Sequence, residues 1–138
     1  MSPFFKQKQG ARAKYQERQG RRVRDALTLS EEFPRLKSLT ASIRYLDSVA
    51  PDNSHPLKFA VNIQRAKSVL RFQCPNTDCI RGDFDLTEEL ARAVKQHSTT
   101  LTGEMPCPGW RSKDTIGTIR CHNALRYAIR LGYSRRRG

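Results

Sequence analysis

The stretch Cys74-Pro75-Asn76-Thr77-Asp78-Cys79 places two cysteines close together, and a wider pair, Cys107 and Cys121, follows it. A Pro108-Gly109-Trp110 turn comes directly after Cys107. No other cysteine occurs in the 138-residue chain. Two thiol pairs beside turns can present four sulfur ligands to one tetrahedral metal ion. The sequence therefore predicts a metal site made of Cys74, Cys79, Cys107 and Cys121.

Cysteines placed at strand ends resemble those of zinc ribbons, and the resemblance covers residues 72–121. It implies a structural Zn²⁺ whose four protein ligands close the coordination shell. Both pairs are more widely spaced than in a zinc ribbon, and we expect a pair of strands to bring Cys107 and Cys121 together. In one alternative, His97 or His122 replaces a thiolate. In another, four reduced cysteines are buried in a core without metal.

Arginines near the cysteines in sequence are candidates for a supporting role. A zinc ion bound by four thiolates leaves the site with net negative charge, which neighbouring cations can offset. The residues in question are Arg71, Arg81 and Arg120. Either they donate hydrogen bonds towards the sulfurs or they face water.

Alternation of apolar and polar residues predicts strands over 39–45, 57–63, 99–105 and 125–133. The segment 57–74 is typical of an antiparallel hairpin that ends at the first cysteine. Helical spacing of apolar residues predicts a helix over about 87–97, with Asp85 and Glu88 as a capping box. We therefore expect an α+β fold: a mainly antiparallel sheet of five to seven strands, one helix and a zinc-ribbon-like site.

The net charge of +13 lies at the two ends of the chain. Residues 1–24 contain eight basic residues and one acid, and residues 120–138 contain six arginines and no acid, so the segment between them is neutral. Cationic ends favour polyanions, among which nucleic acid is the commonest. The predicted nucleic-acid contacts are Lys6, Lys8, Arg12, Lys14, Arg18, Arg21, Arg22, Arg24, Arg126, Arg130, Arg135, Arg136 and Arg137. An acidic membrane surface, or solvation without a partner, are the alternatives.

Three parts of the chain follow from these patterns. Residues 1–28 lack apolar periodicity and are predicted to form a basic arm that is disordered or partly helical. Residues 29–133 form one α+β domain, and residues 134–138 form a basic tail. The first residues contain no apolar run of the ~7–15 residues of a signal peptide, and no window reaches the ~20 of a membrane span. We therefore expect a cytoplasmic protein.

The function expected from these features is binding. A small zinc-stabilised protein would hold RNA, on the ribosome or elsewhere, through its two basic ends, without catalytic activity. A protein-interaction adaptor, in which the neutral segment carries the specific surface, is the alternative. A third reading is a thiol- or metal-dependent enzyme that pairs a cysteine with His55, His97 or His122. The sequence contains no Gly-rich phosphate loop and no serine elbow that would favour catalysis.

Overall fold

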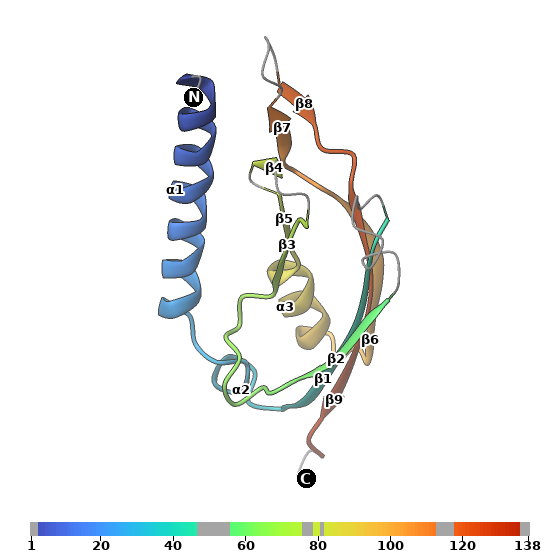
Figure 1. Cartoon of the computed structure of the whole chain (residues 1–138). Helices are drawn as coiled ribbons and strands as arrows, with labels where there is room; N and C mark the ends of the chain where they lie inside the picture. The colour runs from blue at the N-terminus through green and yellow to red at the C-terminus, as the bar shows by residue number, and fades with distance from the viewer. Residues whose placement is uncertain (1–2, 47–55, 76–78, 81, 113–117, 136–138) are drawn as a thin grey trace.

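The computed structural model describes residues 3–46, 56–75, 79–80, 82–112 and 118–135, which form three helices and nine strands (Figure 1). In chain order these are α1 (Pro3–Asp25), α2 (Leu29–Glu32), β1 (Leu36–Tyr45), β2 (Leu57–Val61), β3 (Arg71–Gln73), β4 (Cys79–Ile80), β5 (Asp83–Asp85), α3 (Thr87–Lys95), β6 (Thr100–Pro106), β7 (Trp110–Ser112), β8 (Thr118–Arg120) and β9 (Ala124–Tyr133). The predicted α+β class with mainly antiparallel pairing is confirmed. The described strands divide into sheets of four, two and three strands.

The four-stranded sheet has the order β2-β1-β9-β6, and every pair in it is antiparallel. Its two central strands, β1 and β9, are ten residues long and carry the alternation seen in the sequence. Leu39 and Ile43 of β1 lie opposite Leu131 and Tyr127 of β9, and all four side chains are buried. Because side chains alternate between faces, the polar residues of both strands point to the opposite side of the sheet.

Helix α3 supplies apolar side chains to the buried core of the protein. Leu90 of this helix and Leu86 just before it are fully buried, as the helical spacing predicted. The predicted capping box is wrong, because the helix begins at Thr87 and its N-cap position is Leu86. Asp85 instead accepts a hydrogen bond from the Thr87 amide at 3.0 Å, one residue earlier than expected. The helix ends where His97 adopts a left-handed backbone with φ of 55°.

The predicted hairpin over residues 57–74 is also wrong. Strand β2 pairs with β1 at the edge of the large sheet, whereas β3 pairs with β5. The β3–β5 hairpin places Phe72 opposite Phe84 and joins Arg71 to Asp83 by an ion pair of 2.8 Å. The buried ion pair favours β5 as the partner of β3, and only the cysteine loop separates the two strands in sequence. The ring of Phe72 packs instead against Phe59 of β2.

Helix α1 differs most from expectation, because a disordered or partly helical arm was predicted and 23 residues are helical. Its sequence is rich in Ala, Gln, Lys and Arg, which are strong helix formers even without an apolar stripe. Figure 1 shows α1 standing beside the β3–β5 hairpin. Polar contacts join the two: Tyr15 bonds to Asp83, and Arg22 bonds to Asp85. No helix in the described part of the chain combines the length and apolar character needed to cross a membrane.

Candidate metal centre

The first two cysteines lie at the tip of the β3–β5 hairpin. Cys74 directly follows β3, and Cys79 begins the short strand β4. The amide of Cys74 donates a hydrogen bond to the carbonyl oxygen of Gly82 at 2.6 Å, which closes the loop between the strands. The hairpin therefore turns both thiols towards the same side.

The second two cysteines lie between the β6–β9 pair of strands and the β7–β8 pair. Cys107 separates β6 from β7, and Cys121 separates β8 from β9. Because β6 pairs with β9 and β7 pairs with β8, the chain is paired on both sides of these cysteines. The Cys107 amide bonds to the Asn123 carbonyl at 2.9 Å, and the Cys121 amide bonds to that of Gly109 at 3.1 Å. The prediction that paired strands bring these two cysteines together is confirmed.

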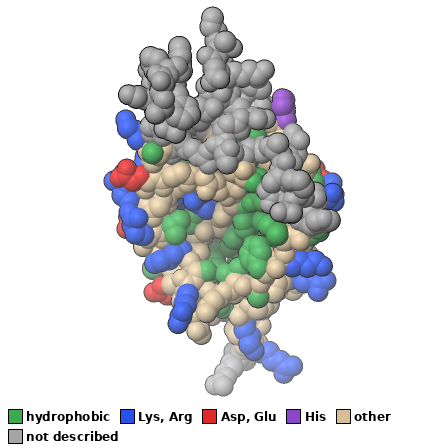
Figure 2. Space-filling model, viewed as in Figure 1, with side chains coloured by type: hydrophobic (Ala, Val, Ile, Leu, Met, Phe, Trp, Pro, Cys, Tyr) green, Lys and Arg blue, Asp and Glu red, His purple; other side chains and the backbone are tan. Residues whose placement is uncertain are grey.

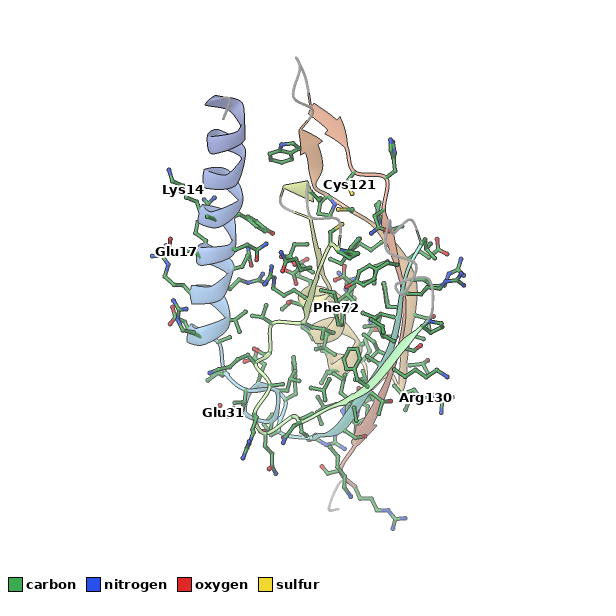
Figure 3. The ribbon with its side chains drawn as sticks, in the orientation of Figure 1. Lys14, Glu17, Glu31, Phe72, Cys121 and Arg130 are labelled. Atoms are coloured by element: carbon green, nitrogen blue, oxygen red, sulfur yellow. The ribbon has the colours of Figure 1, made fainter. Side chains whose placement is uncertain are left out.

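All four sulfur atoms lie within 4.8 Å of one another, and all four cysteines are buried (Figure 3). The Cys79 and Cys107 sulfurs are 3.6 Å apart, and those of Cys74 and Cys121 are 3.9 Å apart. Four thiolates at ~2.3 Å from one central ion would be separated by about 3.8 Å. None of the four forms a disulfide. The group therefore has the dimensions of a four-thiolate metal site.

Two N–H groups approach these sulfurs. The Gly109 amide donates to the sulfur of Cys107 at 3.4 Å, and the side-chain amide of Asn123 donates to that of Cys74 at 3.6 Å. Asn123 is 1% exposed, and its Oδ1 accepts a hydrogen bond from the Ala124 amide. Donors of this kind stabilise metal-bound thiolates. Sequence reasoning missed Asn123, whose only signal is a polar residue beside Cys121 at the start of an apolar alternation.

The arginines expected near the sulfurs do not take that place as far as the structure describes them. Arg71 donates through Nε to both carboxylate oxygens of Asp83, at 2.8 and 2.9 Å, so its prediction as a partner of sulfur is wrong. Arg81 and the side chain of Arg120 fall outside the described parts of the chain. The sulfurs therefore accept hydrogen bonds from the N–H groups of Gly109 and Asn123.

The surroundings of Cys79 and Cys107 raise the pKa of both thiols. Desolvation, followed by the charge of Cys74, raises the pKa of Cys79 to about 12. A hydrogen bond with Cys74, followed by burial, raises the pKa of Cys107 as well. In the absence of a cation, Cys79 and Cys107 therefore favour the protonated thiol. A divalent metal reverses this preference, because a coordinating thiol is deprotonated outright.

The two histidines that could replace a thiolate do not belong to the cysteine group. His97 is exposed, lies against the ring of Tyr133 and contacts Arg35 at 3.1 Å. His122 is exposed, although it follows the buried Cys121. His55 lies outside the described residues. Among the residues that the structure describes, the metal-ligand group is made of four cysteines alone.

The predicted nucleic-acid contacts on α1 have different surroundings. Lys14, Arg18 and Arg24 are exposed, whereas Arg22 is bound to Asp85 at 2.6 Å. Arg21 lies 3.8 Å from Glu17, one turn away on the same helix. Lys6, Lys8 and Arg12 belong to α1, but their side chains are outside the description. Arg22 therefore attaches the helix to the body, and Lys14, Arg18 and Arg24 are the exposed cations of the described part of α1 that form no ion pair.

The predicted nucleic-acid contacts near the C-terminus also differ in their surroundings. Arg126 and Arg130 both project from the exposed side of β9, as the alternation predicted. Arg126 donates through Nε and Nη2 to one carboxylate oxygen of Glu104, at 2.8 and 2.6 Å. Arg135 is exposed, and Arg136 and Arg137 lie outside the described residues.

Comparison with protein-family models, with curated proteins and with solved structures finds no match to this chain. The likeness to zinc ribbons is therefore one of cysteine placement. What the chain does has to be argued from its own residues.

Proposed function

We propose that this protein is a zinc-stabilised RNA-binding protein in which Cys74, Cys79, Cys107 and Cys121 hold one Zn²⁺. The observation that carries the metal is the mutual approach of four buried sulfurs that form no disulfide. Four soft thiolate ligands in a tetrahedral arrangement suit zinc or an iron centre, and zinc needs no redox partner. With four protein ligands the ion has no open position for substrate, so its role is structural.

The strands around the cysteines support a structural role for the ion. Strands β3, β5, β7 and β8 are each three residues long, and β4 has two. Ladders this short are marginal in water unless another interaction holds them. A metal that ties the β3–β5 hairpin to the β7–β8 hairpin supplies that interaction. Asp83 and Asp85, which hold α1, lie on the same hairpin as Cys74, so the ion also supports the basic helix.

The charge of the chain supports RNA as the partner. Figure 2 shows Lys and Arg side chains along both flanks of the molecule in this view, with hydrophobic side chains between them. Lys14, Arg18 and Arg24 of α1 are exposed, and Arg135 extends beyond β9. Cations held on a rigid helix can each neutralise a phosphate and release its counterions, which gives salt-dependent affinity.

The proposal is tested by metal analysis and by RNA titration on the full chain. We expect one zinc per chain by native mass spectrometry. The triple variant K14Q/R18Q/R24Q should weaken binding to a structured RNA and reduce the slope of log affinity against log salt by about 3. The matched control, R65Q/R92Q/K95Q, removes three exposed cations from α3 and a loop, and it should leave the slope near that of the wild type.

Two outcomes overturn the proposal. One is that the wild-type protein has no measurable affinity for RNA at moderate salt. The other is that both triple variants weaken binding equally, which would make the effect one of total charge. Partners captured after nuclease treatment would in either case favour the adaptor reading.

A further inference from the structure

The outer face of the large sheet is open and basic, although the sequence places most of its strands in a neutral segment. Cross-strand register puts Lys58, Ser42, Ala128 and Thr102 in one row across the four strands. On one side of it lies the row of Ala60, Thr40, Arg130 and Thr100. On its other side lies a row that contains Arg44, Arg126 and Glu104. Residues directly opposite in a ladder share a face, so these side chains lie on the side away from the core.

Charges of the body segregate between the two sides of this sheet. Among the described acidic residues, Glu104 alone lies in these rows, and it is bound to Arg126. The other described acids lie on α1, α2, β5 and α3. Two of them, Asp83 and Asp85, are bound to arginines. Within the described residues, Lys58, Arg44 and Arg130 take part in none of the ion pairs. Among the residues that the structure describes, the outer face therefore presents three cations that form no ion pair.

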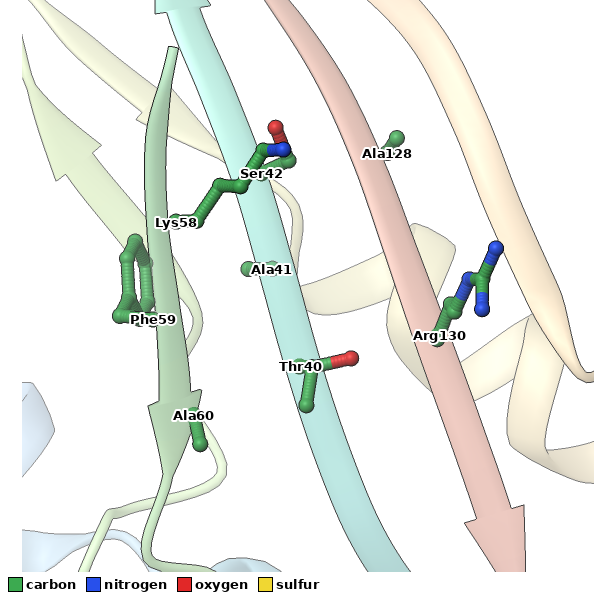
Figure 4. Close-up of a pocket in the computed structure, with 8 residues that line it drawn as sticks. All are labelled: Thr40, Ala41, Ser42, Lys58, Phe59, Ala60, Ala128 and Arg130. Carbon is green, nitrogen blue, oxygen red and sulfur yellow. The ribbon is translucent and has the colours of Figure 1, made fainter.

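A shallow hollow of about 620 Å³ lies between two of these cations (Figure 4). It is lined by Thr40, Ser42, Lys58, Ala60, Ala128 and Arg130, among others. Figure 4 shows Lys58 extending from β2 over its partner Ser42 on β1, and Arg130 standing on β9 beyond the hydroxyl of Thr40. Lys58 and Arg130 are two strands and one row apart, or about 12 Å between their backbones, so a phosphate group can lie between them with hydroxyl donors beneath it.

We propose that this outer sheet face, with Lys58 and Arg130 at its centre, binds the sugar–phosphate backbone of double-helical RNA. The inference rests on the proposed function and adds to it a second surface, on the body itself. The small side chains that line the hollow, such as Ala60 and Ala128, let an RNA backbone approach closely. The Thr and Ser hydroxyls can donate to phosphate or 2′-hydroxyl oxygens.

The composition of the face decides between duplex and single-stranded RNA. Recognition of single strands relies on aromatic side chains on which unpaired bases stack. The described residues of the three rows contain no aromatic ring, and Tyr127 and Tyr45 of the same strands are buried on the other side. Phe59, which also lines the hollow, lies opposite the buried Ala41 and packs its ring against Phe72 of β3. A face of cations, hydroxyls and alanines offers contacts to backbone and none to bases, so its binding should be independent of sequence.

The test compares two double variants of the full-length zinc-loaded protein. K58Q/R130Q removes the two central cations of the outer face, and R92Q/K95Q removes two exposed cations from α3 on the other side of the sheet. Binding to a short RNA duplex is followed by fluorescence anisotropy over a range of salt. We expect K58Q/R130Q to weaken binding about tenfold and to lower the salt slope by about 2. R92Q/K95Q should change neither by a comparable amount.

A second measurement does not depend on substitution. Lys58 should be protected from an amine-reactive reagent when duplex RNA is bound, and Lys95 should not. Equal effects of the two double variants, or no protection of Lys58, would overturn the inference. So would equal or tighter binding of a single strand of the same length.

The outcomes also separate this inference from the proposed function. If K58Q/R130Q binds as the wild type does and the α1 triple variant is weakened, the outer face is not the docking surface and the proposed function stands. If the wild type binds no RNA, both fail.

Discussion

Tyr15 and Asp83 are joined by a hydrogen bond of 2.9 Å that links the N-terminal helix to the hairpin carrying the first two cysteines. Asp83 is 4% exposed and also accepts two bonds from Nε of Arg71. Nη2 of Arg71 in turn donates to Gln16 on α1 at 3.3 Å. The carboxylate therefore lies between α1 and β3. Because it is buried, the loss of any one of its hydrogen bonds should lower the stability of the protein.

Replacing Tyr15 by Phe tests this connection. Asp83 keeps its ion pair with Arg71 but loses the phenol donor, which should cost about 1 kcal/mol of unfolding free energy. The loss should concentrate in α1, whose amides over residues 13–25 should exchange with solvent faster. Hydrogen exchange with mass spectrometry measures this directly.

Tyr133→Phe is the matched control, because the Tyr133 hydroxyl donates to the Ser98 carbonyl at 2.7 Å, away from α1. Its stability cost should be of the same order, and exchange in α1 should be unchanged. If Y15F leaves α1 as protected as Y133F does, the hydrogen bond to Asp83 does not hold the helix.

The same contact should make docking of α1 sensitive to alkali. Burial, and then the hydrogen bond to Asp83, raise the pKa of Tyr15 from 10.0 to about 12. A raised pKa in the folded state means that the stabilisation is fully present below pH 10 and is lost as the pH rises through about 12. The difference between wild-type and Y15F absorbance titrations should show one tyrosinate that forms late. A Tyr15 that ionises near pH 10 would contradict the contact.

Local patterns in the sequence account for much of this fold. The alternation over residues 125–133 predicts β9, whose buried and exposed side chains follow it closely. Leu86 and Leu90 predict the buried side of α3 in the same way. The four cysteines could be predicted to form a group because two thiol pairs beside turns are a common arrangement of metal ligands. In each case the information lies within a few residues or in a rare residue type.

Features that depend on distant partners could not be predicted. Strand β3 pairs with β5, where Asp83 binds Arg71, and no period in residues 57–74 indicates this choice. Helix α1 has no apolar stripe, and it docks through polar bonds to residues more than 60 positions away. The segregation of charge follows from the same cause, since the register of four strands decides which cations share a face with Arg130.

Removal of the metal should unfold the part of the protein built from short strands. We expect a strong chelator to lower the unfolding free energy by several kcal/mol and to expose β3–β5 and β7–β8 to exchange before the large sheet. Because the pKa values of Cys79 and Cys107 are raised, metal binding must displace protons, so affinity should fall as the pH is lowered. Substitution with Co²⁺ should give the thiolate-to-metal charge-transfer absorption of a tetrahedral sulfur site.

Cys107→Ser removes one ligand and should lose the metal, whereas the exposed Ser134→Ala should retain it. A protein that contains no metal as purified and keeps the same stability in chelator would instead support four reduced cysteines packed in the core.

Gly82 leaves no room for a side chain beside the metal ligands. A methyl group at this position would lie 2.4 Å from the sulfur of Cys79 and 2.5 Å from Cβ of Cys74. Both atoms belong to the cysteine group at the tip of the hairpin, so neither can move away without distorting the arrangement of the four sulfurs. Gly82→Ala should therefore weaken metal affinity by about 10–100-fold, the range seen when the support of a metal ligand is lost.

Gly20→Ala is the matched control, because a methyl group there meets only the guanidinium of Arg24, at 3.6 Å, on α1. A glycine inside a helix costs roughly 0.5–1 kcal/mol relative to alanine, so this substitution should stabilise the protein slightly and leave the metal affinity unchanged. Competition with a chromophoric chelator measures both affinities. Equal affinities for G82A and G20A would mean that the hairpin yields at Gly82, and that the sulfur positions are set by the ion rather than by the fold.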